Sequence, residues 1–151
     1  MNSKNTYGWE RLNCPFFTSA CHRVLSPYLE EQGFAEKEVG SIGEIIYKRF
    51  DVFLEIGYEP ETCPNYSPTV VLGLGDSKYD DAGRPAGVPL WYLLPQGHSE
   101  KTGKFWTFKT EADLERMLTE IKTQFLEPHA KPLWLDMNKL EKHIENFRTK
   151  L

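Results

Sequence analysis

The sequence predicts an α+β fold in which an antiparallel sheet of about five strands carries its helices on one face. Three observations favour this class. Apolar side chains recur at every second position through most of residues 46–58, which is typical of strands. The later strand-like segments are joined by short connections without a crossover helix, so neighbouring strands should be antiparallel. Amphipathic helical patterns stand before and after these segments, which gives the order helix, five strands, helix, helix.

The first helix is expected to begin near Pro15, after an N-terminal extension that covers residues 1–14. Pro27 should kink or divide this helix, because proline has no N–H and its ring clashes with the preceding turn. Gly33 can end the helix in the left-handed conformation, with Phe34 folding back onto it. Residues 15–151 would then form a single α+β domain. The buried side of the helix would consist of Phe17, Cys21, Val24, Leu25, Tyr28 and Leu29.

The strands occupy the middle of the chain. Residues 35–43 contain at most a short edge strand. A tight turn or bulge near residues 49–51 should divide the alternating segment into two strands, because a single strand of that length is unusual. Three prolines make residues 60–68 a loop. The other three strands are expected at residues 69–74, 89–94 and 104–108.

Two helices are expected near the C-terminus. The first begins at Thr110, whose hydroxyl can cap a turn that contains Asp113, and Pro128 should end it. Asp136 is expected to cap the last helix, with Leu135 and Leu140 placed to form a hydrophobic staple across its first turn.

Composition narrows the class of protein. The chain has 151 residues, 40% of them hydrophobic and 26% charged, with a formal charge of −4. A domain of this size needs no metal or disulfide to fold. Basic residues form no patch or arm, so we expect no nucleic-acid partner. No apolar run approaches the ~20 residues that span a bilayer, so we expect no membrane partner. Three cysteines without a CxxC motif or a signal peptide predict a reduced, cytoplasmic protein.

Polar loop residues give weak indications of chemistry. Asp76, Asp80 and Asp81 are close in sequence, but their spacing does not match an EF-hand loop, and we expect a solvated loop there rather than a metal site. Cys63 could form a thiol nucleophile with His98, but it precedes a proline in a loop and has no helix N-terminus to lower its pKa. We therefore predict no catalytic residues, no metal and no cofactor.

The second face of the sheet is the main candidate binding surface. The face turned away from the helices would be made mostly of small and aromatic residues: Phe53, Glu55, Gly57, Val71, Gly73 and Gly75, with Trp91 and Leu93 beside them. Glycines within strands often mark the close approach of another molecule, and aromatic patches commonly mark partner surfaces. In the alternative interpretation, residues 1–14 or Trp134 cover this face, or both faces belong to the core.

The order of elements resembles a known but uncharacterised family. A helix ending at Gly33 and Phe34 is followed by strand hairpins, an aromatic segment at residues 105–108 and a capped amphipathic helix, and then by Pro132, Trp134, Leu135 and Asp136 before the last helix. This pattern, over about residues 16–150, resembles a bacterial domain of unknown function whose members are small stand-alone α+β chains. Some related small domains are immunity proteins that neutralise toxins, so the resemblance implies an inhibitor. It carries over no catalytic residues.

These observations lead to three hypotheses. The first is a non-enzymatic protein-binding module, such as an immunity-type inhibitor of a toxin, with Phe53 and Trp91 in its contact surface. The alternative is a small-molecule-binding protein or enzyme whose pocket lies between the sheet and the loops at 59–68 and 95–103, with Tyr66 and His98 in its wall. The third is a homodimer that pairs sheet faces.

Overall fold

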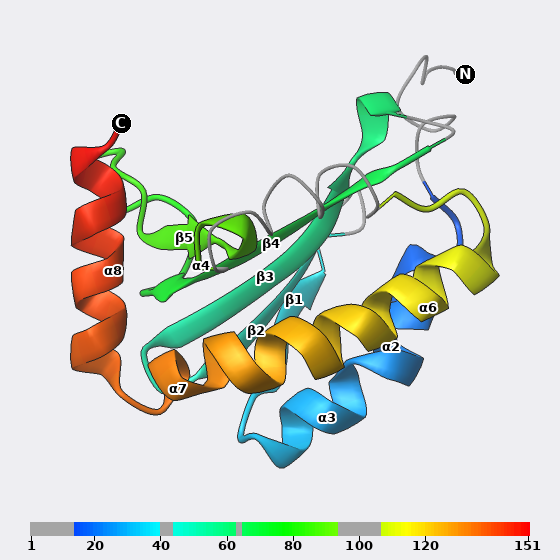
Figure 1. The fold of residues 1–151 in the computed structure, drawn as a ribbon, viewed down its shortest axis with the longest axis horizontal. Coiled ribbons are helices and arrows are strands. Elements are labelled where there is room, and N and C mark those ends of the chain that lie inside the picture. Colours follow the sequence, from blue (N-terminus) through cyan, green and yellow to red (C-terminus); the bar gives the residue numbers. More distant parts are fainter. Residues whose placement is uncertain (1–13, 40–43, 63–64, 94–106) are drawn as a thin grey trace.

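The computed structural model describes residues 14–39, 44–62, 65–93 and 107–151. An antiparallel sheet lies over a layer of helices α2, α3, α6 and α7, and α8 stands beside β4 and β5 (Figure 1). The predicted α+β class is confirmed. The strands follow one another across the sheet in chain order: β1 Ala35–Val39, β2 Ile45–Arg49, β3 Val52–Glu59, β4 Ser67–Leu74 and β5 Gly87–Pro89.

The first helical region is divided as its proline predicts. Helix α2 spans Phe17–Val24 and helix α3 spans Ser26–Glu31, with Pro27 in the first turn of α3. Gly33 has φ +92° and ends α3. Its N–H donates to the carbonyl of Glu30, and the N–H of Phe34 donates to the carbonyl of Leu29, which is the Schellman pattern. The buried Phe34 ring then meets Trp134 at 5.1 Å between centroids, as an apolar lock on the helix end.

The sheet differs from the sequence prediction at both edges. Residues 35–39 form a full edge strand, β1. Strand β5 stops at Pro89, and Leu90–Leu93 form the short helix α4 instead of continuing the strand. Proline has no N–H to extend the ladder, and the helical turn buries Leu90. Of the strand predicted at residues 104–108, only Thr107 and Phe108 are described, and Phe108 makes an isolated bridge to Tyr66.

Pro128 does not end its helix, contrary to the prediction. Helix α6 (Glu111–Glu120) continues into a π-helix, η2 (Ile121–Ala130), and then into α7 (Lys131–Trp134). A π-helical turn is wider than an α-helical one, so the proline ring and its missing N–H are accommodated without a break. The apolar residues of η2 hold it against the core, since Ile121, Phe125 and Leu126 are buried.

Both predicted N-caps are present. Thr110 Oγ1 accepts from the N–H of Asp113 at 3.1 Å, at the start of α6. Asp136 Oδ1 accepts from the N–H of Lys139 at 3.3 Å, at the start of α8 (Met137–Thr149). The predicted staple is only half formed, because Leu140 is fully buried whereas Leu135 remains mostly exposed.

One main core lies between the sheet and the helices. Alternate residues of β3, Val52, Leu54 and Ile56, point into it. The helices contribute large apolar side chains that are fully or nearly fully buried: Leu25, Leu29, Leu114, Leu118, Trp134, Leu140 and Ile144. This core holds the sheet against the helices, and the sheet in turn positions the turns and short helices at the surface.

Candidate protein-binding surface

The second face of the sheet is covered in the structure. Phe53 lies on that face, as its alternation predicts, but its side chain is fully buried. It packs with Ile46, Ala86 and Val71 in a small cluster separate from the main core. Ala86 belongs to the loop 76–86 between β4 and β5, which folds back over this face. Phe53 is therefore a core residue and offers no contact to a partner, which corrects the expectation that it would.

The glycines of this face serve an internal contact. A Cβ atom at Gly73 would lie 2.4 Å from the carbonyl oxygen of Ala86 and 2.5 Å from Cε2 of Phe53. One at Gly87 would lie 2.8 Å from the carbonyl oxygen of Leu72. The absence of side chains thus lets this loop and β5 approach β4 closely, and the approaching segment is part of the same chain.

Ion pairs fasten the beginning of the loop to the sheet. Lys78 Nζ lies 3.1 Å from a carboxylate oxygen of Glu55, a buried residue of β3. Lys48 Nζ donates to the carbonyl of Gly75 at 2.6 Å. Asp76 Oδ1 accepts hydrogen bonds from Lys37 Nζ at 3.2 Å and from Lys48 Nζ at 3.3 Å. These lysines hold the pKa of the Asp76 carboxyl below its usual value.

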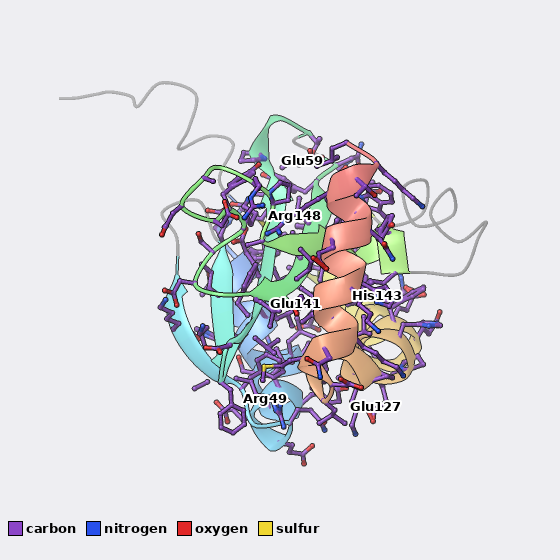
Figure 2. The ribbon with its side chains drawn as sticks, turned by 90° about the vertical axis from the view of Figure 1, so that its left-hand side faces the viewer. Arg49, Glu59, Glu127, Glu141, His143 and Arg148 are labelled. Atoms are coloured by element: carbon purple, nitrogen blue, oxygen red, sulfur yellow. The ribbon has the colours of Figure 1, made fainter. Side chains whose placement is uncertain are left out.

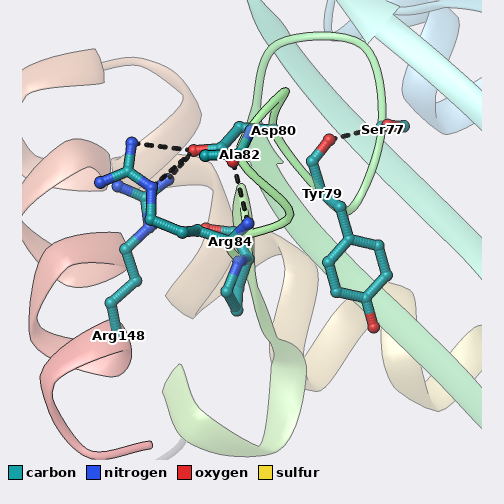
Figure 3. Close-up of polar contacts among 7 residues, drawn as sticks. Ser77, Tyr79, Asp80, Ala82, Arg84 and Arg148 are labelled. Carbon is teal, nitrogen blue, oxygen red and sulfur yellow. Dashed lines mark hydrogen bonds and ion pairs between the residues drawn. The ribbon is translucent and has the colours of Figure 1, made fainter.

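The end of the loop is organised by Asp80 (Figure 3). Its carboxylate accepts from the backbone N–H groups of Ala82 and Arg84 and from Arg84 Nε at 3.0 Å. The bond from the Arg84 N–H contributes most to lowering the pKa of Asp80. Arg148 of α8 donates from Nε to the carbonyl of Pro85 at 2.7 Å and reaches Asp80 at 3.5 Å.

These contacts show what the acidic residues of the loop do. Asp76 and Asp80 bind different basic side chains, one at the start of the loop and one near its middle. In the described ranges, no group of three or more His, Cys, Asp and Glu side chains is arranged to hold a metal ion. The carboxylates act as anchors for the loop.

Tyr66 and His98 are not brought together by any described contact. Tyr66 is buried, with its ring stacked on Phe108 at 5.2 Å and edge-on to Tyr58 at 5.1 Å. His98, Cys63 and the rest of the loop at 95–103 lie outside the described residues. In the described part of the chain Tyr66 thus belongs to the aromatic core between β4 and Phe108, and the pocket with Tyr66 and His98 in its wall stays a prediction.

Trp91 is exposed, but on a helix and not on the sheet. Helix α4 turns Leu90 inward and leaves the Trp91 side chain 52% exposed. The Trp91 ring is edge-on to Tyr92 at 6.1 Å and to Phe147 of α8 at 6.3 Å. Tyr92 and Phe147 are themselves edge-on at 5.0 Å, and Lys150 Nζ lies 5.4 Å from the Tyr92 centroid. We call Trp91, Tyr92, Phe147 and Lys150 the aromatic surface.

The aromatic surface is held by the same contacts that anchor the loop. Arg148 follows Phe147 directly, and its hydrogen bond to Pro85 fixes the last turn of α8 against the residues that lead into β5 and α4. Sequence reasoning did not assign Phe147 or Lys150 to a surface. The sequence does contain a signal for Phe147. It lies three residues after Ile144, so both are on the apolar side of the last helix, and Phe147 is near the helix end, where this side reaches the solvent.

A separate groove of about 450 Å³ lies between α2–α3 and η2. Two of its polar side chains, Arg23 and Tyr28, bind carboxylates of α6 and η2. Arg23 pairs with Glu111 and Glu115, and the Tyr28 hydroxyl donates to Glu127 at 2.7 Å. Burial, and then the bond to Glu127, raise the pKa of Tyr28. The groove is open, and these contacts join α2 and α3 to α6 and η2 within the helical layer.

Comparisons with protein-family models, with curated proteins and with solved structures find no match to this chain. None of the helices in the described ranges combines the length and the apolar character needed to cross a membrane.

Proposed function

We propose that this chain is a non-enzymatic protein-binding module that holds its partner through the aromatic surface. One observation carries the proposal: Trp91 is 52% exposed while Tyr92 and Phe147 hold its ring edge-on from two helices. Tryptophan and tyrosine dominate the binding energy of protein interfaces. A ring whose position is already fixed loses little conformational entropy when a partner covers it.

Burial of Trp91 would supply part of the binding energy. Covering the exposed half of the Trp91 side chain would remove on the order of 100 Å² of mostly apolar surface, worth roughly 2–3 kcal/mol before the costs of association. Tyr92, Phe147 and the Lys150 methylenes extend this surface, and the Lys150 ammonium group supplies a charged rim.

The mode of action we propose is occlusion, as in an immunity-type inhibitor of a toxin. An inhibitor of this kind covers a functional surface of its target and needs no chemistry of its own. The resemblance in the order of elements supports this role, and the formal charge of −4 favours a basic partner over an acidic one.

The test is affinity purification of the tagged protein from its source cells, read by mass spectrometry. Three baits are compared: wild type, Trp91→Glu, and the control Tyr79→Glu, which adds the same charge at another exposed aromatic residue. We expect one stoichiometric protein with wild type and with the control, and its loss with Trp91→Glu. Melting curves check that both variants remain folded.

Two results would overturn the proposal. Equal recovery of every captured protein by wild type and Trp91→Glu would show that the aromatic surface is not the contact. A wild-type preparation without any partner would favour the small-molecule hypothesis, which ligand screening by thermal shift would then address. A doubled mass in solution that Trp91→Glu reduces to a monomer would identify the partner as a second copy of the chain.

A further inference from the structure

The turn between β2 and β3 places a bulky residue in an unfavourable conformation. Arg49 pairs with Val52, so Phe50 and Asp51 form a two-residue hairpin turn. Phe50 has φ +54°, and it is the single non-glycine residue with positive φ among the described residues. Two-residue hairpin turns favour glycine, asparagine or aspartate at such positions, because a large side chain is strained there.

Burial does not compensate for this strain. The Phe50 side chain is 81% exposed, the largest exposure among the large apolar side chains of the described residues. Neither the local backbone nor the core therefore accounts for phenylalanine at this position. A strained residue that the fold does not use is a reason to look for a function.

The Phe50 ring has a fixed support. It lies over the guanidinium of Arg49, with Cζ 5.2 Å from the ring centroid. Arg49 is itself fastened at two points, because Nε donates to the carbonyl of Gln32 at 2.9 Å and Nη1 to the carbonyl of Trp134 at 3.0 Å. Figure 2 shows Arg49 at the end of the molecule where α8 begins. The hairpin tip is thus tied to the ends of α3 and α7.

Two more exposed apolar residues lie at this end. Leu135 directly follows Trp134 and is 58% exposed, and Met137 begins α8 and is 44% exposed. We call Phe50, Leu135 and Met137, together with the Arg49 that supports Phe50, the turn surface. It is separated from the aromatic surface by the 13-residue length of α8, or about 20 Å.

We propose that the turn surface is a second docking site, at which Phe50 enters a concave apolar pocket of a partner protein and a carboxylate at the pocket rim approaches Arg49. The surface exposes on the order of 300 Å² of apolar area, far below the roughly 800 Å² that each copy contributes to a stable dimer. A single ring at the tip of a hairpin matches a pocket, not a flat face.

The charge of the rim follows from the surroundings of Arg49. Both acceptors that the described residues offer its guanidinium are neutral backbone carbonyls. A partner that covers Phe50 also removes water from the cation beneath it, which is unfavourable unless an anion is supplied. An acidic group in the partner supplies it.

The variant Phe50→Gly distinguishes an effect on folding stability from an effect on partner binding. Glycine adopts φ +54° without strain, so the melting temperature should stay the same or rise. Binding should be lost. The bait carrying Phe50→Gly is compared with wild type, Trp91→Glu and the control Tyr79→Gly in the same purification from source cells. The captured protein is then purified and titrated directly against each variant.

We expect a protein that binds wild type and Tyr79→Gly alike, at least about tenfold more tightly than Phe50→Gly, and less tightly as salt is raised. Capture that depends on Trp91 but is unchanged by Phe50→Gly overturns this inference and leaves the proposed function standing. The absence of any captured protein overturns both. A Phe50→Gly variant that melts several degrees lower would show that Phe50 supports the fold, which also refutes the inference.

Discussion

Replacement of Arg49 by methionine tests a polar side chain that joins the hairpin to the ends of two helices. Arg49 donates one hydrogen bond to the carbonyl at the C-cap of α3 and one to the carbonyl of Trp134, the last residue of α7. Carbonyls at helix C-termini lack partners within the helix and carry the negative end of the helix dipole. Methionine keeps much of the aliphatic stem but donates nothing.

The expected loss follows from these two bonds. A hydrogen bond from a charged donor contributes about 1.5–3 kcal/mol, and water can replace part of it because Arg49 is only half buried. We expect Arg49→Met to lower the free energy of unfolding by about 2–3 kcal/mol. For a domain of about 150 residues this corresponds to a fall in melting temperature of about 5–10 °C. The melting temperature of Arg49→Lys should lie between those of wild type and Arg49→Met, because an ammonium group lacks the fork that reaches both carbonyls.

The assay is chemical and thermal unfolding followed by circular dichroism. The matched control is Arg116→Met, because the Arg116 side chain is mostly exposed and, among the described residues, forms an ion pair only with Asp113, at 3.5 Å. A surface pair of this kind contributes less than about 0.5 kcal/mol. If Arg49→Met unfolds together with Arg116→Met, Arg49 does not stabilise the helix ends and the argument from its two hydrogen bonds is wrong.

Two further predictions concern the loop 76–86. Gly73→Ala should lower the free energy of unfolding by about 3 kcal/mol, because the added Cβ would clash with backbone atoms. The control Gly57→Ala should lower it by less than about 1 kcal/mol, because flexible side chains surround that site. Equal urea midpoints for the two variants would refute the close packing of this loop. The lowered pKa values of Asp76 and Asp80 mean that their contribution to stability is present above the usual value of 3.8 and is lost as pH falls through the lower folded values. The melting temperature should therefore fall below about pH 4, and Asp80→Asn, but not Asp81→Asn, should make that fall shallower; identical pH profiles would exclude Asp80 as an anchor.

The sequence anticipated the fold best where the determinants are local. The end of α3 at Gly33, the caps at Thr110 and Asp136, and the division of the first helix at Pro27 all depend on one residue and its immediate neighbours. The alternation in β3 likewise correctly placed Phe53 on the opposite face from the residues that enter the main core.

Predictions failed where distant residues decide the outcome. Pro128 would end an isolated α-helix, but burial of the apolar residues of η2 favours a π-helical turn through it. The strand predicted to continue beyond Pro89 is replaced by α4, because the helix buries Leu90 in the core. Leu135 was expected to close a staple and is instead exposed beside the turn that Arg49 fastens. Each depends on packing that no short window of sequence contains.

The sequence alone determined the class of fold, the division of the first helix at Pro27, its end at Gly33 and the caps at Thr110 and Asp136, because these follow from periodicity and from the backbone preferences of single residues. Only the tertiary structure decided which surfaces are available to a partner. The loop 76–86 covers Phe53, α4 turns Trp91 outward against Phe147, and Arg49 supports Phe50 at the hairpin tip. Exposure is set by what the rest of the chain packs against a residue, and these packing partners are distant in sequence.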